Sequence, residues 1–248
     1  MKCNFNLLLF SVLLMTACET APKMPVMGDR EVFDVAVEEI SGICLNSDKT
    51  ALLAVGDQGV VKQVSFTGEV THILDYDADM EDVTLDPNTG DMYIADEWHQ
   101  GVLKLDSPEY QNCNMQFYVQ EAIDDQYKNS GLEGISYYKD DIFFVGSQKG
   151  SNLWQYKKDG TVLSKVSLSE FACEIAGLCY DSVADWLWVI DSKSVKIYIC
   201  KIDGQLLATY DLEDVKNAES ICVDRDRNCV WVGSDEDSPK LYKYSFEF

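Results

Sequence analysis

The chain has 248 residues, with 20 lysines and arginines, 43 aspartates and glutamates and two histidines, which give a formal net charge of −23. This charge opposes the phosphate backbone of nucleic acids, and no basic segment offsets it, so we expect no nucleic-acid partner. A hydrophobic content of 46% argues against an acidic disordered chain and is enough to build the core of one sizeable domain.

The N-terminal segment has the pattern of a bacterial lipoprotein signal. Lys2 precedes the apolar run Leu7–Met15, which is too short to span a bilayer as a mature helix. Met15-Thr16-Ala17-Cys18 resembles a lipobox, so we expect residues 1–17 to be removed and Cys18 to be lipidated. Ordinary secretion is the alternative. Residues 18–29 then form a tether, and the protein belongs to the cell envelope, held only by lipid at the outer membrane, facing the periplasm or the surface.

Seven cysteines remain beyond Cys18, and their pattern does not indicate a zinc site. No CxxC pair is present, and two histidines are too few for a Cys/His site. An odd number of cysteines argues against a complete disulfide framework. Cys44, Cys179 and Cys222 lie in strand patterns, where we expect free thiols that fill the core, with one or two disulfides as the alternative.

A repeat of about forty residues organises the rest of the chain. Its openings are Ile40-Ser41-Gly42-Ile43, Met80-Glu81-Asp82-Val83, Leu132-Glu133-Gly134-Ile135, Ile175-Ala176-Gly177-Leu178 and Ala218-Glu219-Ser220-Ile221. After each opening come a turn and a strongly apolar run, as in Ala51–Asp57 and Trp186–Asp191. A third, alternating segment and a fourth follow, joined by turns such as Asp159-Gly160. Four short strands in each repeat predict the blades of a β-propeller.

The repeats predict an all-β fold that consists of one propeller domain over residues 30–248. Five four-stranded blades fit the spacing, and six are the alternative. The last repeat has only three strands, while an orphan strand, Glu31–Val37, precedes the first repeat. We therefore expect this N-terminal strand to complete the last blade and close the ring, which protects edges that would otherwise promote aggregation.

The repeat openings resemble those of a known family. Glu39-Ile40-Ser41-Gly42-Ile43, Leu132-Glu133-Gly134-Ile135 and Glu174-Ile175-Ala176-Gly177-Leu178 are similar to openings in SdiA-regulated proteins. The resemblance implies a bacterial cell-envelope β-propeller of poorly defined biochemical role. Similar openings occur in NHL-repeat proteins and in gluconolactonase-like propellers. The latter hold a divalent ion at the axis, although this chain lacks asparagine at the equivalent positions.

Carboxylates gather at one mouth of the predicted channel. The first strand of a blade starts, and the second strand ends, on the same face of a propeller. Several like charges there raise pKa values or recruit a cation, and Ca²⁺ prefers oxygen ligands. The alternative is that these acids only line a hydrated channel. The candidate metal ligands are Glu81, Glu133, Glu219, Asp57, Asp96 and Asp191.

These features predict a lipid-anchored binding or scaffolding module, with a protein, peptide or small-molecule ligand on the acidic face. The alternative is a metal-dependent envelope hydrolase of the lactonase or phosphoesterase type. No G-x-S-x-G motif is present, and His72 and His99 are the only histidines that could act in catalysis. His72 lies in an outer-strand segment, so His99, which follows a second strand near the same mouth, is the better candidate catalytic residue.

Overall fold

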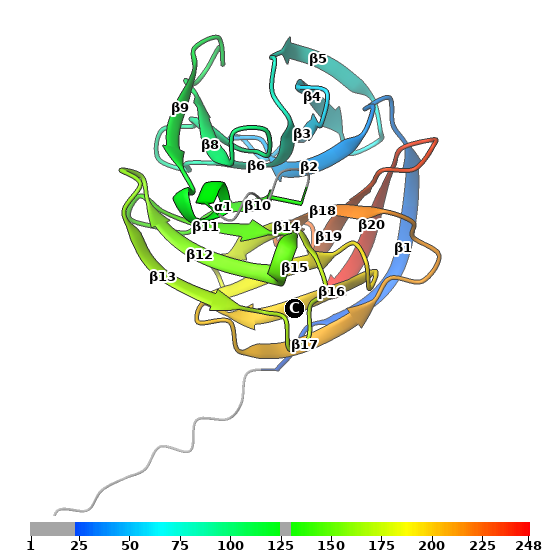
Figure 1. Ribbon diagram of the computed structural model, residues 1–248. Coiled ribbons are helices and arrows are strands. Elements are labelled where there is room, and N and C mark those ends of the chain that lie inside the picture. Colours follow the sequence, from blue (N-terminus) through cyan, green and yellow to red (C-terminus); the bar gives the residue numbers. More distant parts are fainter. Residues whose placement is uncertain (1–22, 125–129) are drawn as a thin grey trace, which may run out of the picture.

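The computed structural model describes residues 23–124 and 130–248, which form five four-stranded antiparallel sheets around a central axis (Figure 1). The prediction of a five-bladed β-propeller is confirmed, and the alternative of six blades is wrong. The predicted signal segment and the lipidation site Cys18 lie outside the described residues.

The two inner strands of each blade position the channel. The first strands are β2 (Ile40–Leu45), β6 (Met80–Leu85), β10 (Leu132–Tyr137), β14 (Ile175–Asp181) and β18 (Ala218–Asp224). The second strands are β3 (Ala51–Gly56), β7 (Met92–Asp96), β11 (Ile142–Ser147), β15 (Trp186–Asp191) and β19 (Cys229–Ser234). Neighbouring blades cover both faces of the second strands, and nearly all of their residues are buried, as the apolar runs predict.

The two outer strands complete each blade. The third strands are β4 (Val60–Ser65), β8 (Gly101–Leu105), β12 (Asn152–Lys157), β16 (Lys196–Lys201) and β20 (Lys240–Glu247). The fourth strands, at the rim of the ring in Figure 1, are β5 (Val70–Asp75), β9 (Cys113–Tyr118), β13 (Val162–Ser167), β17 (Leu206–Asp211) and β1 (Val26–Asp34). Gly160 and Gly204 have positive φ values of 84° and 87°, as tight turns between third and fourth strands require.

The N-terminal strand closes the ring. β1 pairs with β20 in antiparallel register, from Val26 opposite Glu247 to Asp34 opposite Lys240, so the last blade contains both ends of the propeller. This closure is the one that the orphan strand predicts, although β1 begins and ends earlier than the expected Glu31–Val37. β1 also includes residues 26–29, which the sequence assigns to the tether.

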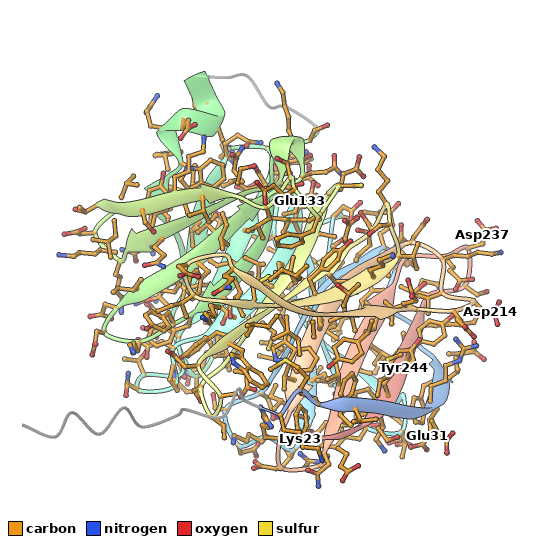
Figure 2. The ribbon with its side chains drawn as sticks, turned by 90° about the horizontal axis from the view of Figure 1, so that it is seen from below. Lys23, Glu31, Glu133, Asp214, Asp237 and Tyr244 are labelled. Carbon is orange, nitrogen blue, oxygen red and sulfur yellow. The ribbon has the colours of Figure 1, made fainter. Side chains whose placement is uncertain are left out.

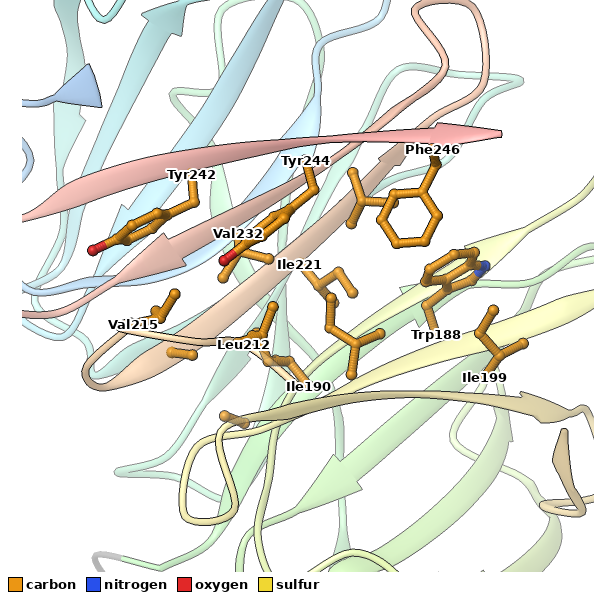
Figure 3. Close-up of a cluster of buried hydrophobic side chains, with 14 of the residues drawn as sticks. Trp188, Ile190, Ile199, Leu212, Val215, Ile221, Val232, Tyr242, Tyr244 and Phe246 are labelled. Atoms are coloured by element: carbon orange, nitrogen blue, oxygen red, sulfur yellow. The ribbon is translucent and has the colours of Figure 1, made fainter. Parts of the chain in front are cut away.

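The core lies between adjacent blades. Figure 3 shows the cluster between the fourth and fifth blades, in which Trp188 packs edge-on against Phe246 with ring centroids 5.3 Å apart. Ile190 and Ile221 lie in the same cluster and are fully buried. Each second strand contributes to two such clusters because its side chains alternate between its two faces.

The described residues contain little besides strands. The insertion in the second repeat contains the short helix α1 (Gln120–Asp124), and the turn η1 (Lys149–Ser151) follows β11. None of the helices in these residues is long and apolar enough to cross a bilayer. All seven cysteines of the described part of the chain are free thiols, as the odd count favours.

Candidate functional site: an acidic channel mouth

A β-bulge near the start of every first strand places an additional residue at the mouth of the channel. The pairing of first and second strands shifts register there in all five blades, for example between Met80 and Asp82. A bulge breaks the alternation of the strand and re-aims a side chain. The bulged residues are Ser41, Glu81, Glu133, Ala176 and Glu219.

Four of the six carboxylates predicted as metal ligands lie together at this mouth. Asp57, which follows β3, is close enough to raise the pKa of both Glu81 and Glu219. Glu81 and Glu219 in turn raise the pKa of Glu133. The Ser41 hydroxyl donates a short hydrogen bond to Asp57, which orients that carboxylate. The first-strand glutamates thus share one electrostatic site with Asp57.

Two further acids, which sequence reasoning missed, complete the site. The carboxyl oxygens of Asp79, Glu81 and Glu97 lie within 4.8 Å of one another. The Glu97 amide donates to the Asp79 carbonyl oxygen at 2.9 Å, which joins the loop before β6 to the loop after β7. Glu97 is buried, and its carboxylate accepts the Gly131 amide at 2.8 Å. Each acid lies one or two residues from a predicted ligand, and that proximity is the signal that could have found them.

Burial and mutual repulsion raise the pKa values of these carboxyls, so that they keep their protons to a higher pH than usual. Burial, followed by the charges of Asp57 and Glu97, raises the pKa of Glu81 to about 9. Burial also raises the pKa of Glu219 to about 7 and that of Asp79 to about 6, with acidic neighbours adding to both shifts. Two carboxylates 4.8 Å apart repel by about 3 kcal/mol at an effective dielectric constant near 20. The site therefore favours either protons or a cation.

Glu133 and Glu97 form a hydrogen-bonded pair of carboxyls. Burial raises the pKa of Glu133 well above its usual range, and repulsion by Glu81 raises it further. The hydrogen bond between the two groups also raises the pKa of Glu133 and opposes the rise for Glu97. In this pair the Glu133 carboxyl therefore donates the hydrogen bond, and the Glu97 carboxylate accepts it.

Asp96 and Asp191, the other two predicted ligands, have their carboxylates engaged in separate loops. Both are fully buried. Asp191 accepts the amides of Cys173 at 2.6 Å and Ser194 at 2.9 Å, which fixes the loops beside β15. Asp96 lies 2.6 Å from Nδ1 of His99, the predicted catalytic residue. The His99 side chain is 54% exposed, so its imidazole is oriented by a buried carboxylate and still reaches solvent.

The arrangement fits a hard cation that prefers oxygen ligands. Two oxygens bound to one Ca²⁺ are at most about 5 Å apart, twice the usual Ca–O distance, and Asp79, Glu81 and Glu97 meet that limit. In the described part of the chain, lysine and arginine form their ion pairs with other acids than these three. Asp79, Glu81 and Glu97 would hold the ion, and Glu133 lies beside them.

A buried aspartate separates this mouth from the other end of the channel. Asp82 follows Glu81 and accepts the amides of Val83, Ile135 and Leu178 at 2.8, 2.9 and 3.0 Å, so it joins three blades at the axis. The position equivalent to Asp82 in the first blade is Gly42, where a Cβ would lie 2.5 Å from the Asp82 Cα. The glycine allows the first strands to approach closely at this level.

Comparison with known proteins identifies relatives of the fold. The family model described as SdiA-regulated matches residues 23–159 and 151–247. No functionally curated protein matches the sequence.

Several solved structures of enzymes have a similar fold. The chain is similar to glutaminyl cyclase of Myxococcus xanthus, with a TM-score of 0.67, 12% identity and coverage of 90% of this chain and 96% of that one. A gluconolactonase of Xanthomonas campestris matches with a TM-score of 0.59, 12% identity and coverage of 89% and 91%. A streptogramin B lyase matches with a TM-score of 0.53, 15% identity and coverage of 88% and 72%. At these identities the likeness concerns the fold alone.

Proposed function

Because the chain belongs to the SdiA-regulated family, and because its carboxyls converge at one channel mouth, we propose that it is a cation-dependent binding module of the cell envelope. Asp79, Glu81 and Glu97 bind one divalent ion, Ca²⁺, and the bound ion presents its remaining coordination positions to a ligand. The observation that carries this proposal is the convergence of three carboxyl oxygens within 4.8 Å without a positive side chain among them.

The direction of the chain supports a role in the envelope. In Figure 2 Glu133 and Asp237 lie toward one side of the molecule, and Lys23 lies toward the opposite side. β1 runs from that opposite side toward the acidic mouth, since Val26 pairs with the end of β20 and Asp34 with its start. A membrane anchor attached N-terminal to β1 would act on this opposite side, and the mouth would then be turned away from the membrane and open to a ligand.

A thermal melt with and without metal tests the cation site. Ca²⁺ at 100 times its Kd stabilises the folded state by about 2.7 kcal/mol, which raises the Tm of a domain of this size by roughly 5–10 °C. We expect this rise with Ca²⁺ and its reversal with chelator. Glu81→Gln removes one of the three carboxylates and should abolish the rise.

Glu69→Gln is the matched control because Glu69 is exposed on an outer turn, away from the channel. It should keep the full Ca²⁺ effect. A Tm that does not change with Ca²⁺ beyond an ionic-strength control, or a Glu81→Gln variant that still responds, would refute the cation site.

The Asp96–His99 pair supports a second candidate function, a metal-dependent hydrolase. A buried carboxylate that orients an exposed imidazole is the arrangement of a general base, and Asp96 also contributes to the raised pKa of Asp79. The ion would polarise a substrate oxygen, and His99 would activate water.

A panel of ester, lactone and phosphoester substrates distinguishes the two functions. A hydrolase should lose at least about 100-fold in kcat/KM with His99→Ala, as loss of a general base requires, and also with Glu81→Gln. His72→Ala is the matched control, because His72 lies on the outer strand β5. Turnover that survives both site changes, or no turnover at all, leaves the binding function as the better account.

A further inference from the structure

The end of the channel opposite the acidic mouth opens into a cavity of about 650 Å³. The fifth residue of every first strand forms its floor, at the same level of the five blades. These residues are Cys44, Thr84, Ser136, Cys179 and Cys222. The volume lies within the range of about 300–1,000 Å³ that is typical of small-molecule sites. The cavity is therefore large enough to hold a whole small ligand.

The inner end of this cavity is closed. Asp82 is fully buried at the axis, where its carboxylate accepts amides from three blades. The first strands also approach one another closely at this level, since a Cβ at Gly177 would lie 2.8 Å from the Glu219 carbonyl oxygen. A ligand therefore enters and leaves by this mouth and does not reach the proposed calcium site.

The polar atoms of the floor are used by the fold. Thr84 Oγ1 and Ser136 Oγ each accept a backbone amide of the next blade, at 3.0 and 2.8 Å. Cys179 Sγ accepts the Val223 amide at 3.3 Å, which repeats this pattern. A free thiol otherwise packs as a small apolar group. The floor therefore offers a ligand mainly carbon and sulfur surface.

Apolar and aromatic side chains form the wall of the cavity. Tyr138 lines it, and the Tyr138 ring packs edge-on against Tyr180 with centroids 4.7 Å apart. Aromatic rings favour such contacts with further rings, and sulfur also packs favourably against ring edges. The wall therefore favours an aromatic ligand. The sixth residues of the five first strands all line the cavity and are all apolar or aromatic: Leu45, Leu85, Tyr137, Tyr180 and Val223.

The two charged side chains of the described lining, Lys49 and Asp86, already have partners. Lys49 Nζ pairs with Asp226 at 3.0 Å. Asp86 is 2% exposed, accepts the Asn88 amide at 2.9 Å and pairs with Lys158 at 3.5 Å. A charged ligand would lose hydration without gaining a partner of its own, so the cavity favours a neutral one.

We propose that this cavity is a binding site for a neutral aromatic small molecule. The ligand enters with its ring toward the floor of the cavity and packs between the tyrosine rings and the thiols. Binding is non-covalent, since burial of the ring and its contacts with the wall provide the affinity. The site is separate from the carboxylates of the proposed calcium site and does not depend on that proposal.

Two dyes with the same aromatic skeleton test the site. N-phenyl-1-naphthylamine is neutral, and 8-anilinonaphthalene-1-sulfonate adds a negative charge; the fluorescence of both rises when they leave water. We expect the neutral dye to bind one per chain with a micromolar Kd, and the sulfonate to bind at least about 10-fold more weakly because its charge finds no free partner. No saturable binding of the neutral dye, or equal affinity for the two dyes, would overturn the proposal.

Cys44→Phe places a ring in the cavity and should weaken binding of the neutral dye by about 10-fold or more, as loss of fitting volume in an apolar pocket does. Cys173→Phe is the matched control, because Cys173 is an exposed cysteine outside the cavity. Glu81→Gln, at the other mouth, should also bind the dye as tightly as the unmodified chain. A folded Cys44→Phe variant with unchanged affinity would show that the dye binds elsewhere.

Methyl NMR of the unmodified chain gives a readout that needs no variant. The bound neutral dye should shift the methyl signals of Leu45, Leu85 and Val223, which line the cavity. The signals of Leu163, which is 43% exposed on β13, should not move. Shifts at Leu163 as large as those in the lining would indicate adsorption to exposed apolar surface and would also overturn the proposal.

Discussion

At the scale of single residues, Asp82 links neighbouring blades at the channel axis. It is fully buried, and its carboxylate joins the second, third and fourth blades through three amides. Burial raises the pKa of Asp82 well above its usual range, and the three hydrogen bonds, which favour the charged form, offset only part of this rise. No ion pair in the described chain neutralises it, so backbone dipoles provide its stabilisation.

Replacement of Asp82 by asparagine should destabilise the propeller strongly. The amide of Asn places an NH₂ group where one carboxylate oxygen now accepts, and it faces N–H groups that lose their partner. We expect the free energy of unfolding to fall by about 2–4 kcal/mol, measured by denaturant unfolding. Asp34→Asn, at the exposed end of β1, should change it by less than about 0.5 kcal/mol. Equal losses in the two variants would contradict the assigned role.

At the scale of elements, periodicity was sufficient to predict the blades. The apolar runs mark the second strands because two neighbouring blades bury them, and β15 is buried over its whole length. Ring closure also followed from counting strands. The first and last residues of β1 could not be predicted in this way, because its residues are mostly exposed and its pairing with β20 decides where it starts.

The candidate site was only partly predictable, since the contacts between its loops do not follow the repeat. The bulge residues Glu81, Glu133 and Glu219 could be found because they recur at one place in each repeat. The contribution of Asp79 and Glu97 depends on how two loops meet, which the repeat does not encode. The same limit applies to Asp96 and Asp191, whose carboxylates turn to local amides and to His99 rather than to the axis.

The cysteines of the first strands, which line a cavity of about 650 Å³ at the end of the channel opposite the acidic mouth, show a related limit. The strand pattern correctly placed Cys44, Cys179 and Cys222 inside first strands as free thiols. Their meeting at one level follows from the ring order of the blades, in which β18 lies between β14 and β2. Sequence repeats identify equivalent positions in the blades. Which of these positions become neighbours across the axis is known only from the order of the blades in the closed ring.

At the scale of the whole molecule, the crowding of carboxyls at the acidic mouth makes the stability of the fold depend on pH. The carboxyls of Glu81, Glu219 and Asp79 have pKa values of about 9, 7 and 6 in the folded protein, above their values in the unfolded chain. At a pH between the pKa of a group in the unfolded chain and its pKa in the folded protein, the folded state binds more protons than the unfolded state. The stability of the metal-free protein must therefore fall as the pH rises through this window.

We expect the Tm of the metal-free protein to decrease by roughly 10 °C or more between pH 5 and pH 8 at constant ionic strength. Ca²⁺ replaces the protons, so its stabilising effect should grow over the same range. Glu81→Gln should flatten the metal-free profile because a neutral amide no longer needs a proton, whereas Glu69→Gln should follow the unmodified chain. A Tm that rises with pH in the absence of metal would contradict the raised pKa values. A Ca²⁺ effect that is largest at pH 5 would show that the ion and the protons do not compete for the same carboxyls.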